Sequence, residues 1–239
     1  MTKADEKLDV LAFSAHPDDI ELAAGGTLIK LIKQGYKVGI IDMTRGELGT
    51  RGTREIRQQE AQQAARLMGA SIRDCLDIPD GGVTVNRENH LKVIHVLRKY
   101  RPSIVVNHYW RARHADHMAT SQIVTEACYL SGLAKIDTSQ ERHRPKRILF
   151  HQILYDVVPS FVVDVSAEAE QKRQVVRAHK SQFYDPESKE PETLLSAPTF
   201  LDMIETRMRY WGSLIGVSHA EPFLTTEPIA IPDLVAAMG

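Results

Sequence analysis

Four side chains that could bind a metal ion or carry a proton lie close together near the start of the chain. They are His16, Asp18, Asp19 and Glu21. One cation could contact both His16 and Asp19, which are three positions apart, while Asp18 could face a bound water. A helix start with aspartate as its N-cap fits the same pattern, because aspartate is a favoured N-cap residue. Spacing alone therefore leaves metal binding and helix capping open.

A second polar cluster occupies residues 111–117. His114 and His117 are again three positions apart, with the carboxylate of Asp116 between them. Taken alone, this cluster is equally ambiguous, because Asp116 could cap a helix and both imidazoles could be solvated. Two histidines and one carboxylate, however, are a familiar ligand set of catalytic zinc, which keeps one position open for water. The two clusters make such a site only if the fold brings them together.

Apolar runs alternate with amphipathic helical patterns through most of the sequence. This alternation predicts βαβ units, a mainly parallel sheet and right-handed crossovers. A strand order of 3-2-1-4 would place both clusters at the carboxyl edge of neighbouring strands, where open α/β folds bind ligands. We expect one α/β domain over residues 1–239. The predicted strands are residues 8–13, 37–43, 71–76, 103–107, 147–154 and 161–165, and the predicted helices are residues 22–34, 54–68, 89–100, 116–131, 166–183 and 199–214, before an irregular tail.

Together the clusters could supply each part of a metal-assisted hydrolysis. A bound divalent cation lowers the pKa of its water toward about 7. Asp18 could then accept the proton as general base, and His114 could act as an acid or stabilise a developing oxyanion. Asp116 could orient His114 through the imidazole N–H, or simply cap the helix. Zn²⁺ suits these ligands, and Fe²⁺ is accepted by the same set.

The two clusters resemble the motifs of the LmbE/PIG-L family of zinc-dependent N-acetylglucosamine deacetylases, in residues 15–21 (Ala-His-Pro-Asp-Asp-Ile-Glu) and 113–117 (Arg-His-Ala-Asp-His). The resemblance implies a Rossmann-like three-layer α/β/α sandwich that hydrolyses the amide of an N-acetyl amino sugar. The functional residues that it implies are the zinc ligands His16, Asp19 and His117, the general base Asp18, and His114, which would stabilise the tetrahedral intermediate.

The similarity extends over nearly the whole chain and is greatest to the bacillithiol-pathway branch, whose substrate is N-acetylglucosaminyl malate. The broad family pattern has Pro and Glu where this chain has Ala15 and Ile20, and these two residues are similar to that branch instead. From Ala115, at a position where proline is common, we expect little effect. The resemblance also implies a homo-hexamer. Further matching segments are residues 44–50, 57–61, 180–183 and 212–217.

Two arginines are candidates for contacting the substrate. Arg57 follows the glycine-rich loop of residues 44–53, and the family has an arginine there that contacts substrate. A malate carboxylate would accept two parallel hydrogen bonds from its guanidinium. The alternative is a surface pair between Arg57 and Glu60. Arg113 in the second motif is the other candidate, and Arg111 is a weaker one.

Other conspicuous residues receive structural roles or none. We expect His108 and His151 at strand ends. Gly25 and Gly26 follow the first strand, but the spacing G-x-G-x-x-G of a dinucleotide-binding loop is absent. Glu47 lies in the loop over the expected site, and the sequence assigns it no role.

The composition favours a small-molecule partner. The 30 basic side chains nearly cancel the 31 acidic ones, which argues against a nucleic-acid or membrane surface. No apolar run approaches the roughly 20 residues that a membrane span needs, and the first residues lack the apolar core of a signal peptide. We therefore expect a cytoplasmic protein in which Cys75 and Cys128 are buried free thiols.

Three alternatives stay open at this point. The substrate could be another N-acetyl amino sugar, such as a chitooligosaccharide or an inositol glycoside. A nucleotide-binding Rossmann module would use the same polar loops to hold phosphates. A zinc-binding protein without catalysis would keep the ligands but would not release acetate.

Overall fold

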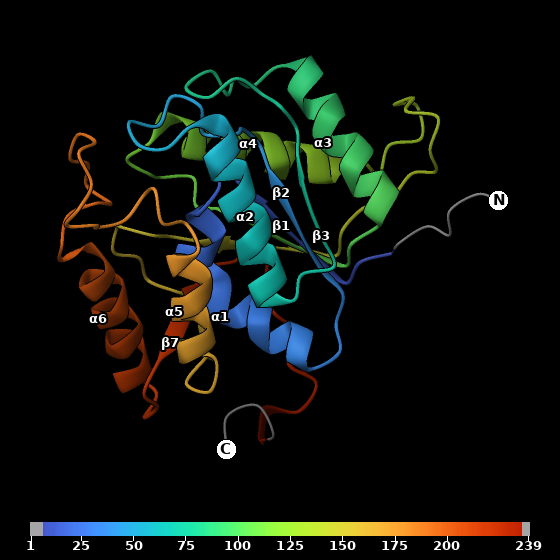
Figure 1. The fold of residues 1–239 in the computed structure, drawn as a ribbon. Helices are drawn as coiled ribbons and strands as arrows, with labels where there is room; N and C mark the ends of the chain where they lie inside the picture. Colours follow the sequence, from blue (N-terminus) through green and yellow to red (C-terminus); the bar gives the residue numbers. More distant parts are fainter. Residues whose placement is uncertain (1–6, 236–239) are drawn as a thin grey trace.

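In a computed structural model, which describes residues 7–235, the chain forms a single α/β domain around a five-stranded parallel sheet (Figure 1). The order β3-β2-β1-β4-β5 confirms the predicted neighbours and adds a fifth strand beside β4. The strands are β1 (Val10–Ser14), β2 (Val38–Asp42), β3 (Ile72–Cys75), β4 (Ile104–His108) and β5 (Arg147–His151), while β6 (Phe161–Asp164) and β7 (Ala220–Phe223) form a separate antiparallel pair.

Helices cover both faces of the sheet. Side chains of α3 and α4 share one apolar cluster with the strands, and side chains of α1, α2 and α5 share another on the opposite face. Helix α6 lies outside these layers, beside β7 (Figure 1). The helices are α1 (Asp19–Lys33), α2 (Arg54–Met68), α3 (Arg87–Tyr100), α4 (Ala115–Leu130), α5 (Ala169–Arg177) and α6 (Phe200–Ser213).

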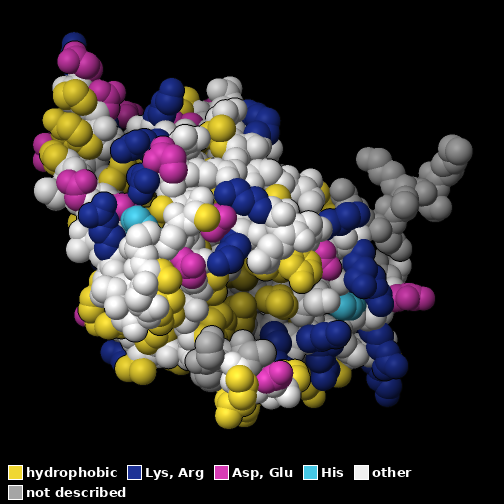
Figure 2. Space-filling view, turned by 90° about the horizontal axis from the view of Figure 1, so that it is seen from below, with side chains coloured by type: hydrophobic (Ala, Val, Ile, Leu, Met, Phe, Trp, Pro, Cys, Tyr) yellow, Lys and Arg dark blue, Asp and Glu magenta, His cyan; other side chains and the backbone are white. Residues whose placement is uncertain are grey.

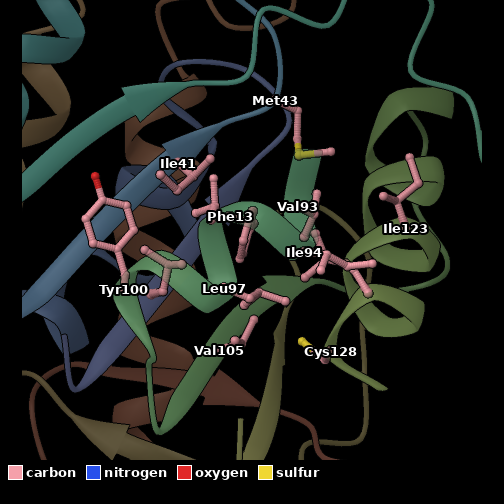
Figure 3. Packing of buried hydrophobic residues seen from close by; sticks show 14 of the residues in the cluster. Phe13, Ile41, Met43, Val93, Ile94, Leu97, Tyr100, Val105, Ile123 and Cys128 are labelled. Atoms are coloured by element: carbon pink, nitrogen blue, oxygen red, sulfur yellow. The ribbon is translucent and has the colours of Figure 1, made fainter. Parts of the chain in front are cut away.

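The central strand β1 is buried on both of its faces. Leu11 and Phe13 belong to one apolar cluster, whereas Val10 and Ala12 belong to the other. Successive side chains of a strand point to opposite faces, so a strand covered on both sides reads as a continuous apolar run. Figure 3 shows the first cluster, in which Phe13 lies among side chains from α3 and α4.

Both cysteines are free thiols, but only Cys128 is buried. Cys128 packs in the cluster of Figure 3, and burial raises the pKa of its thiol. Cys75 ends β3 and is half-buried, and the pKa of its thiol is raised to about 12, mainly by burial. The predicted burial of both thiols is therefore wrong for Cys75, because β3 is an edge strand of the sheet.

The structure corrects several predicted boundaries. Helix α1 begins at Asp19 rather than at residue 22, so the second of the two adjacent aspartates is already part of the helix. Helix α5 occupies Ala169–Arg177 instead of residues 166–183. After Arg177 the chain forms tighter turns, in which the His179 amide donates to the Val176 carbonyl and the Gln182 amide donates to the His179 carbonyl. Strand β5 ends at His151 rather than at residue 154.

The tail, which the sequence predicts to be irregular, contains strand β7. Pro222 suggested a break, because proline cannot donate to a strand ladder. In the structure it pairs with Val162 in a two-stranded ribbon, where every position belongs to an edge strand. Phe150 of β5 also bridges to Leu224, which joins the ribbon to the main sheet.

The surface agrees with the balanced composition. On the face in Figure 2, basic, acidic and apolar side chains are interspersed, although Lys and Arg gather toward one end. Within residues 7–235, no helix is both long and apolar enough to cross a membrane.

A buried ion pair contacts the backbone of helix α1 where the chain has two consecutive glycines. Glu221 of β7 accepts hydrogen bonds from the amides of Gly26 and Thr27, at 2.9 and 2.7 Å. The Lys172 ammonium donates to Glu221 at 2.6 Å and to the Leu22 carbonyl at 2.8 Å. A Cβ at Gly26 would lie 3.0 Å from the Glu221 carboxylate. The same Cβ would lie 2.9 Å from Val165, so Gly26 allows this helix to approach both Val165 and the ion pair, whereas a Cβ at Gly25 would make only ordinary contacts.

Glu221→Gln should destabilise the protein by about 3–5 kcal/mol, because it leaves the Lys172 ammonium buried without a counter-charge. Urea unfolding followed by circular dichroism measures this change. Glu227→Gln is the matched control: Glu227 forms an exposed pair with Arg147, and its loss should change the free energy of unfolding by less than about 1 kcal/mol. Equal effects of the two substitutions would contradict the assigned role of the buried pair.

Candidate active site

The two polar clusters meet at the carboxyl ends of β1 and β4. These strands are hydrogen-bonded neighbours, with Val10 opposite Ile104. The first cluster forms the turn from β1 into α1, and the second leads from β4 into α4. Their side chains line one cavity of about 460 Å³. The fold thus brings together residues that are far apart in the sequence, as the predicted strand order requires.

Three potential metal-binding side chains form a compact triangle. His16 Nδ1 lies 3.4 Å from one Asp19 carboxylate oxygen, and His117 Nε2 lies 3.2 Å from the other. The two imidazole nitrogens are 3.3 Å apart. A tetrahedral ion with ligands at about 2.0–2.1 Å requires donor atoms about 3.3 Å from one another. The side chains predicted as ligands therefore have donor spacings close to those of a zinc-sized cation. They fall into two overlapping groups that could hold a metal ion, namely His16 with His114 and His117, and Asp19 with His108 and His117. A similar ion such as Fe²⁺ would accept the same donors.

The turn that carries this triangle is strained at Asp18. Asp18 has φ of 123° and ψ of −27°, a backbone conformation that costs energy for a residue other than glycine. Its side chain makes no capping hydrogen bond, so the helix-cap alternative is wrong for this residue. Arg57 holds the turn, since its guanidinium donates to the Pro17 carbonyl at 2.9 Å and to the Asp18 carboxylate at 3.3 Å.

The Asp18 carboxylate lies in the wall of the cavity beside Asp19. Burial raises the pKa of the Asp18 carboxyl to about 6, although the Arg57 guanidinium opposes the shift. A general base is most effective when its pKa is near the working pH. The environment of Asp18 therefore suits proton transfer near neutral pH.

Arg57 is buried and does not form the surface pair offered as its alternative. Its third contact is the Gly46 carbonyl, at 2.7 Å, while Glu60 binds the backbone amide and the hydroxyl of Ser181, both at 2.7 Å. Gly46 has φ of +66°, and a Cβ there would lie 2.1 Å from the guanidinium. The glycine-rich loop is thus shaped around Arg57, which also lines the cavity.

His114 lies next to the triangle with its tautomer fixed by the backbone. Its ring centre is 4.6 Å from that of His16. Its Nδ1 accepts the Asp116 amide at 3.2 Å, so the neutral ring carries its proton on Nε2. Burial lowers the pKa of His114, which favours this neutral form. The side chain can therefore act as a hydrogen-bond donor in the cavity.

The carboxylate of Asp116 supports a different histidine from the one expected. It lies 3.4 Å from His16 Nε2 and accepts the Gly81 amide at 2.8 Å. Asp116 is hydrogen-bonded to the His114 ring through its backbone amide and not through its carboxylate. The predicted orientation of His114 by this carboxylate is therefore wrong, because the Asp116 side chain, in the first turn of α4, points toward the first motif.

Asp80 is a site residue that the sequence did not reveal. Its carboxylate is 3.0 Å from His16 Nε2, the ring nitrogen outside the donor triangle. A carboxylate in this position accepts the second N–H of a metal-binding histidine and fixes its tautomer. In the sequence, Asp80 is part of an ordinary Pro-Asp-Gly-Gly turn, and no local pattern connects it with the motif 64 positions earlier.

His108 is adjacent to the triangle but is occupied. Its Nε2 accepts the Ala15 amide at 3.0 Å, and that same nitrogen lies 3.5 Å from Asp19. Its ring stacks on that of His117 at 4.3 Å. Burial holds the pKa of His108 well below its usual range, so it is neutral. His108 therefore packs against the predicted ligands, and it also belongs to a possible metal-binding group with Asp19 and His117. Both His108 and His151 end strands, as expected.

Glu21, the last residue of the first motif, is engaged below the site. Arg73 forms ion pairs with both Glu21 and Asp42, and His179 lies 3.2 Å from Glu21. Burial would raise the pKa of Glu21, but Arg73 and His179 outweigh it and lower that pKa to about 2. Glu21 thus anchors the first turn of α1 to β2 and β3.

Two arginines of the second cluster differ in position. Arg113 is exposed and lines the cavity, whereas Arg111 is exposed outside it. Arg113 has neither a hydrogen bond nor an ion pair with any other residue in the described part of the chain. Its guanidinium is therefore available to a ligand.

Known proteins share both the sequence pattern and the fold. The family model PIG-L, described as GlcNAc-PI de-N-acetylase, matches residues 11–128. The conserved protein TT1542 from Thermus thermophilus superimposes with a TM-score of 0.86 at 37% identity, covering 94% of this chain and 98% of its own.

Two relatives with named activities also match. A diacetylchitobiose deacetylase from Thermococcus kodakarensis is 29% identical in an alignment 227 residues long, which covers 89% of this chain and 80% of the relative. A probable N-acetyl-alpha-D-glucosaminyl L-malate deacetylase from Bacillus anthracis is 27% identical in an alignment 196 residues long, which covers 73% of this chain and 81% of the relative.

His117→Ala should reduce the metal content of the purified protein to background, because it removes one corner of the donor triangle. His114→Ala is the matched control and should retain the metal, since its Nδ1 is bonded to the backbone. Elemental analysis after dialysis measures both. If His114→Ala loses as much metal as His117→Ala, the ion is held by a donor set that includes His114, and the assigned triangle is incorrect.

Proposed function

The chain belongs to the PIG-L (LmbE) family of deacetylases, and from this premise we propose that it removes the acetyl group from an N-acetylglucosaminide. The observation that carries the proposal is the position of Asp18. This carboxylate makes no capping hydrogen bond to helix α1. It lies in a cavity beside the donor triangle, whose interatomic distances suit a zinc ion. The cavity volume is within the range of roughly 300–1,000 Å³ typical of small-molecule sites.

A divalent cation held by His16, Asp19 and His117 would polarise the acetyl carbonyl and lower the pKa of water. Asp18 accepts a proton from the attacking water as oxygen adds to the carbonyl carbon. His114 donates its Nε2–H to the carbonyl oxygen as negative charge develops there. The C–N bond then breaks, and the leaving amine takes the proton that Asp18 accepted from the water. The products are acetate and a free glucosamine derivative.

For the natural substrate we propose N-acetylglucosaminyl malate, the bacillithiol precursor. The support is the unpaired Arg113 guanidinium in the cavity wall. A malate carboxylate would form charge-assisted hydrogen bonds with it, whereas diacetylchitobiose carries no charge. The competing proposal, a neutral chitooligosaccharide, is favoured by the similarity to the Thermococcus enzyme.

Zinc, a cytoplasmic location and a homo-hexamer complete the proposal. Zinc rests on the dimensions of the triangle, with Fe²⁺ as the alternative ion. The cytoplasmic location rests on two cysteines that stay unpaired, which is typical of a reducing compartment. The hexamer rests on the family resemblance alone.

Asp18→Asn should keep the metal and lower kcat by about 10²–10⁴-fold, because the amide cannot accept the proton. Asparagine also tolerates a positive φ, so the turn should be preserved. Metal analysis combined with an acetate-release assay measures both properties. Asp156→Asn, at a side chain that is 99% exposed, is the control and should behave as the wild type. Full activity of Asp18→Asn would refute the assignment of the base.

Arg113→Ala should raise KM for N-acetylglucosaminyl malate by about 10–100-fold, the value of a charge-assisted hydrogen bond. It should leave turnover of diacetylchitobiose unchanged. Arg111→Ala, which removes a guanidinium outside the cavity, should affect neither substrate. An equal effect of Arg113→Ala on both substrates, or no effect on either, would contradict recognition of an anionic aglycone.

A further inference from the structure

The Asp80 carboxylate contacts both the proposed ligand His16 and the glycine-rich loop of residues 44–53. One oxygen of Asp80 lies 3.0 Å from His16 Nε2, and the other accepts the Leu48 amide at 2.9 Å. The Asp80 side chain is only 7% exposed, so water competes little for either bond. Each oxygen therefore has a separate partner, one in the metal-binding motif and one in the glycine-rich loop.

The contact between loop and turn is reciprocal. While the Asp80 carboxylate accepts the Leu48 amide, the Asp80 amide donates to the Glu47 carboxylate at 2.9 Å. Glu47, to which the sequence assigns no role, thus helps to attach the loop to the turn that contains Asp80. Gly81 has φ of +68°, a conformation that glycine adopts without strain, and it lies against the Leu48 side chain at the tip of the loop. Leu48 is 72% exposed and lines the cavity.

We infer that Asp80 is a positioning residue that couples the order of residues 46–50 to the metal affinity of the site. A neutral His16 has one N–H, and donation to Asp80 from Nε2 leaves Nδ1 unprotonated toward Asp19 and His117. If the loop moves away, Asp80 loses two of its three contacts and holds His16 less firmly. Because such coupling is reciprocal, metal binding must also protect the loop. This inference rests on the proposed role of His16 as a metal ligand.

Asp77 offers a matched control for Asp80. It lies three positions earlier and ties the same loop to the same segment through an ion pair with Arg45. That pair is largely on the surface, with Asp77 53% exposed, and none of its contacts involves His16. Asp77→Asn thus weakens the loop attachment without touching the ligand, whereas Asp80→Asn affects both.

The test measures two quantities in the full-length protein. Chelator competition gives the Zn²⁺ affinity, and hydrogen exchange with mass spectrometry gives protection of residues 46–50 with and without Zn²⁺. Asp80→Asn should weaken Zn²⁺ binding by about 10–100-fold and abolish the protection that Zn²⁺ gives the loop. Asp77→Asn should bind Zn²⁺ as the wild type does. Glu47→Ala, which leaves the His16 contact intact, should weaken Zn²⁺ binding by a smaller factor, and Glu47→Gln should restore it.

Wild-type Zn²⁺ affinity in Asp80→Asn would overturn the positioning role, and unchanged affinity in Glu47→Ala would overturn the coupling to the loop. A failure of the metal site itself gives a different result: His117→Ala would then bind Zn²⁺ as tightly as the wild type. The melting temperatures of the metal-free variants separate these outcomes from general unfolding, since Asp80→Asn and Asp77→Asn should melt within a few degrees of each other.

Discussion

The meeting of the two polar clusters in the candidate site depends on the pairing of β1 with β4. The carboxyl ends of parallel strands lie at one edge of a sheet, so this pairing sets the two polar loops next to each other. It is possible because β1 is apolar on both faces and can occupy the centre of the sheet, with β2 on its other side. Without the register of Val10 with Ile104, His117 would not reach Asp19.

The second constraint is electrostatic. Four carboxylates of the site are largely buried, namely Asp18, Asp19, Asp80 and Asp116, and burying a charge is costly unless it is paired. Each one has a partner: the Arg57 guanidinium, the histidines, or a backbone amide of a glycine-rich loop or turn. This requirement explains why glycine-rich segments surround the site. Glycine allows the backbone donors and the Arg57 guanidinium to approach closely.

Much of this arrangement could be predicted from the sequence, because it depends on local patterns. The apolar run before His16 predicts a buried strand, and alternation with helices predicts the order that brings both motifs to one edge. The contact between Asp80 and His16 could not be predicted in this way. Asp80 lies in the loop that follows the edge strand β3, and its Pro-Asp-Gly-Gly sequence is typical of any turn.

The partner of Asp116 and the strand β7 were missed for a similar reason. The direction of the Asp116 side chain depends on how α4 begins relative to the first motif, which the spacing of His114 and His117 does not define. Pro222 is compatible with a strand only because β7 pairs at an edge, and this is a property of the tertiary structure. Likewise, Gly26 is explained by its close contacts with Val165 and Glu221, which lie far along the chain.

Acetate release from N-acetylglucosaminyl malate, measured beside diacetylchitobiose, tests the central claim most directly. The purified protein should hydrolyse the malate glycoside faster, lose the activity when a chelator removes the metal, and regain it when stoichiometric Zn²⁺ is added back. Acetate release that is unaffected by removal of the metal would contradict a metal-dependent site built on His16, Asp19 and His117. Faster turnover of diacetylchitobiose would still support deacetylase activity, but it would refute the proposal that the natural substrate is anionic.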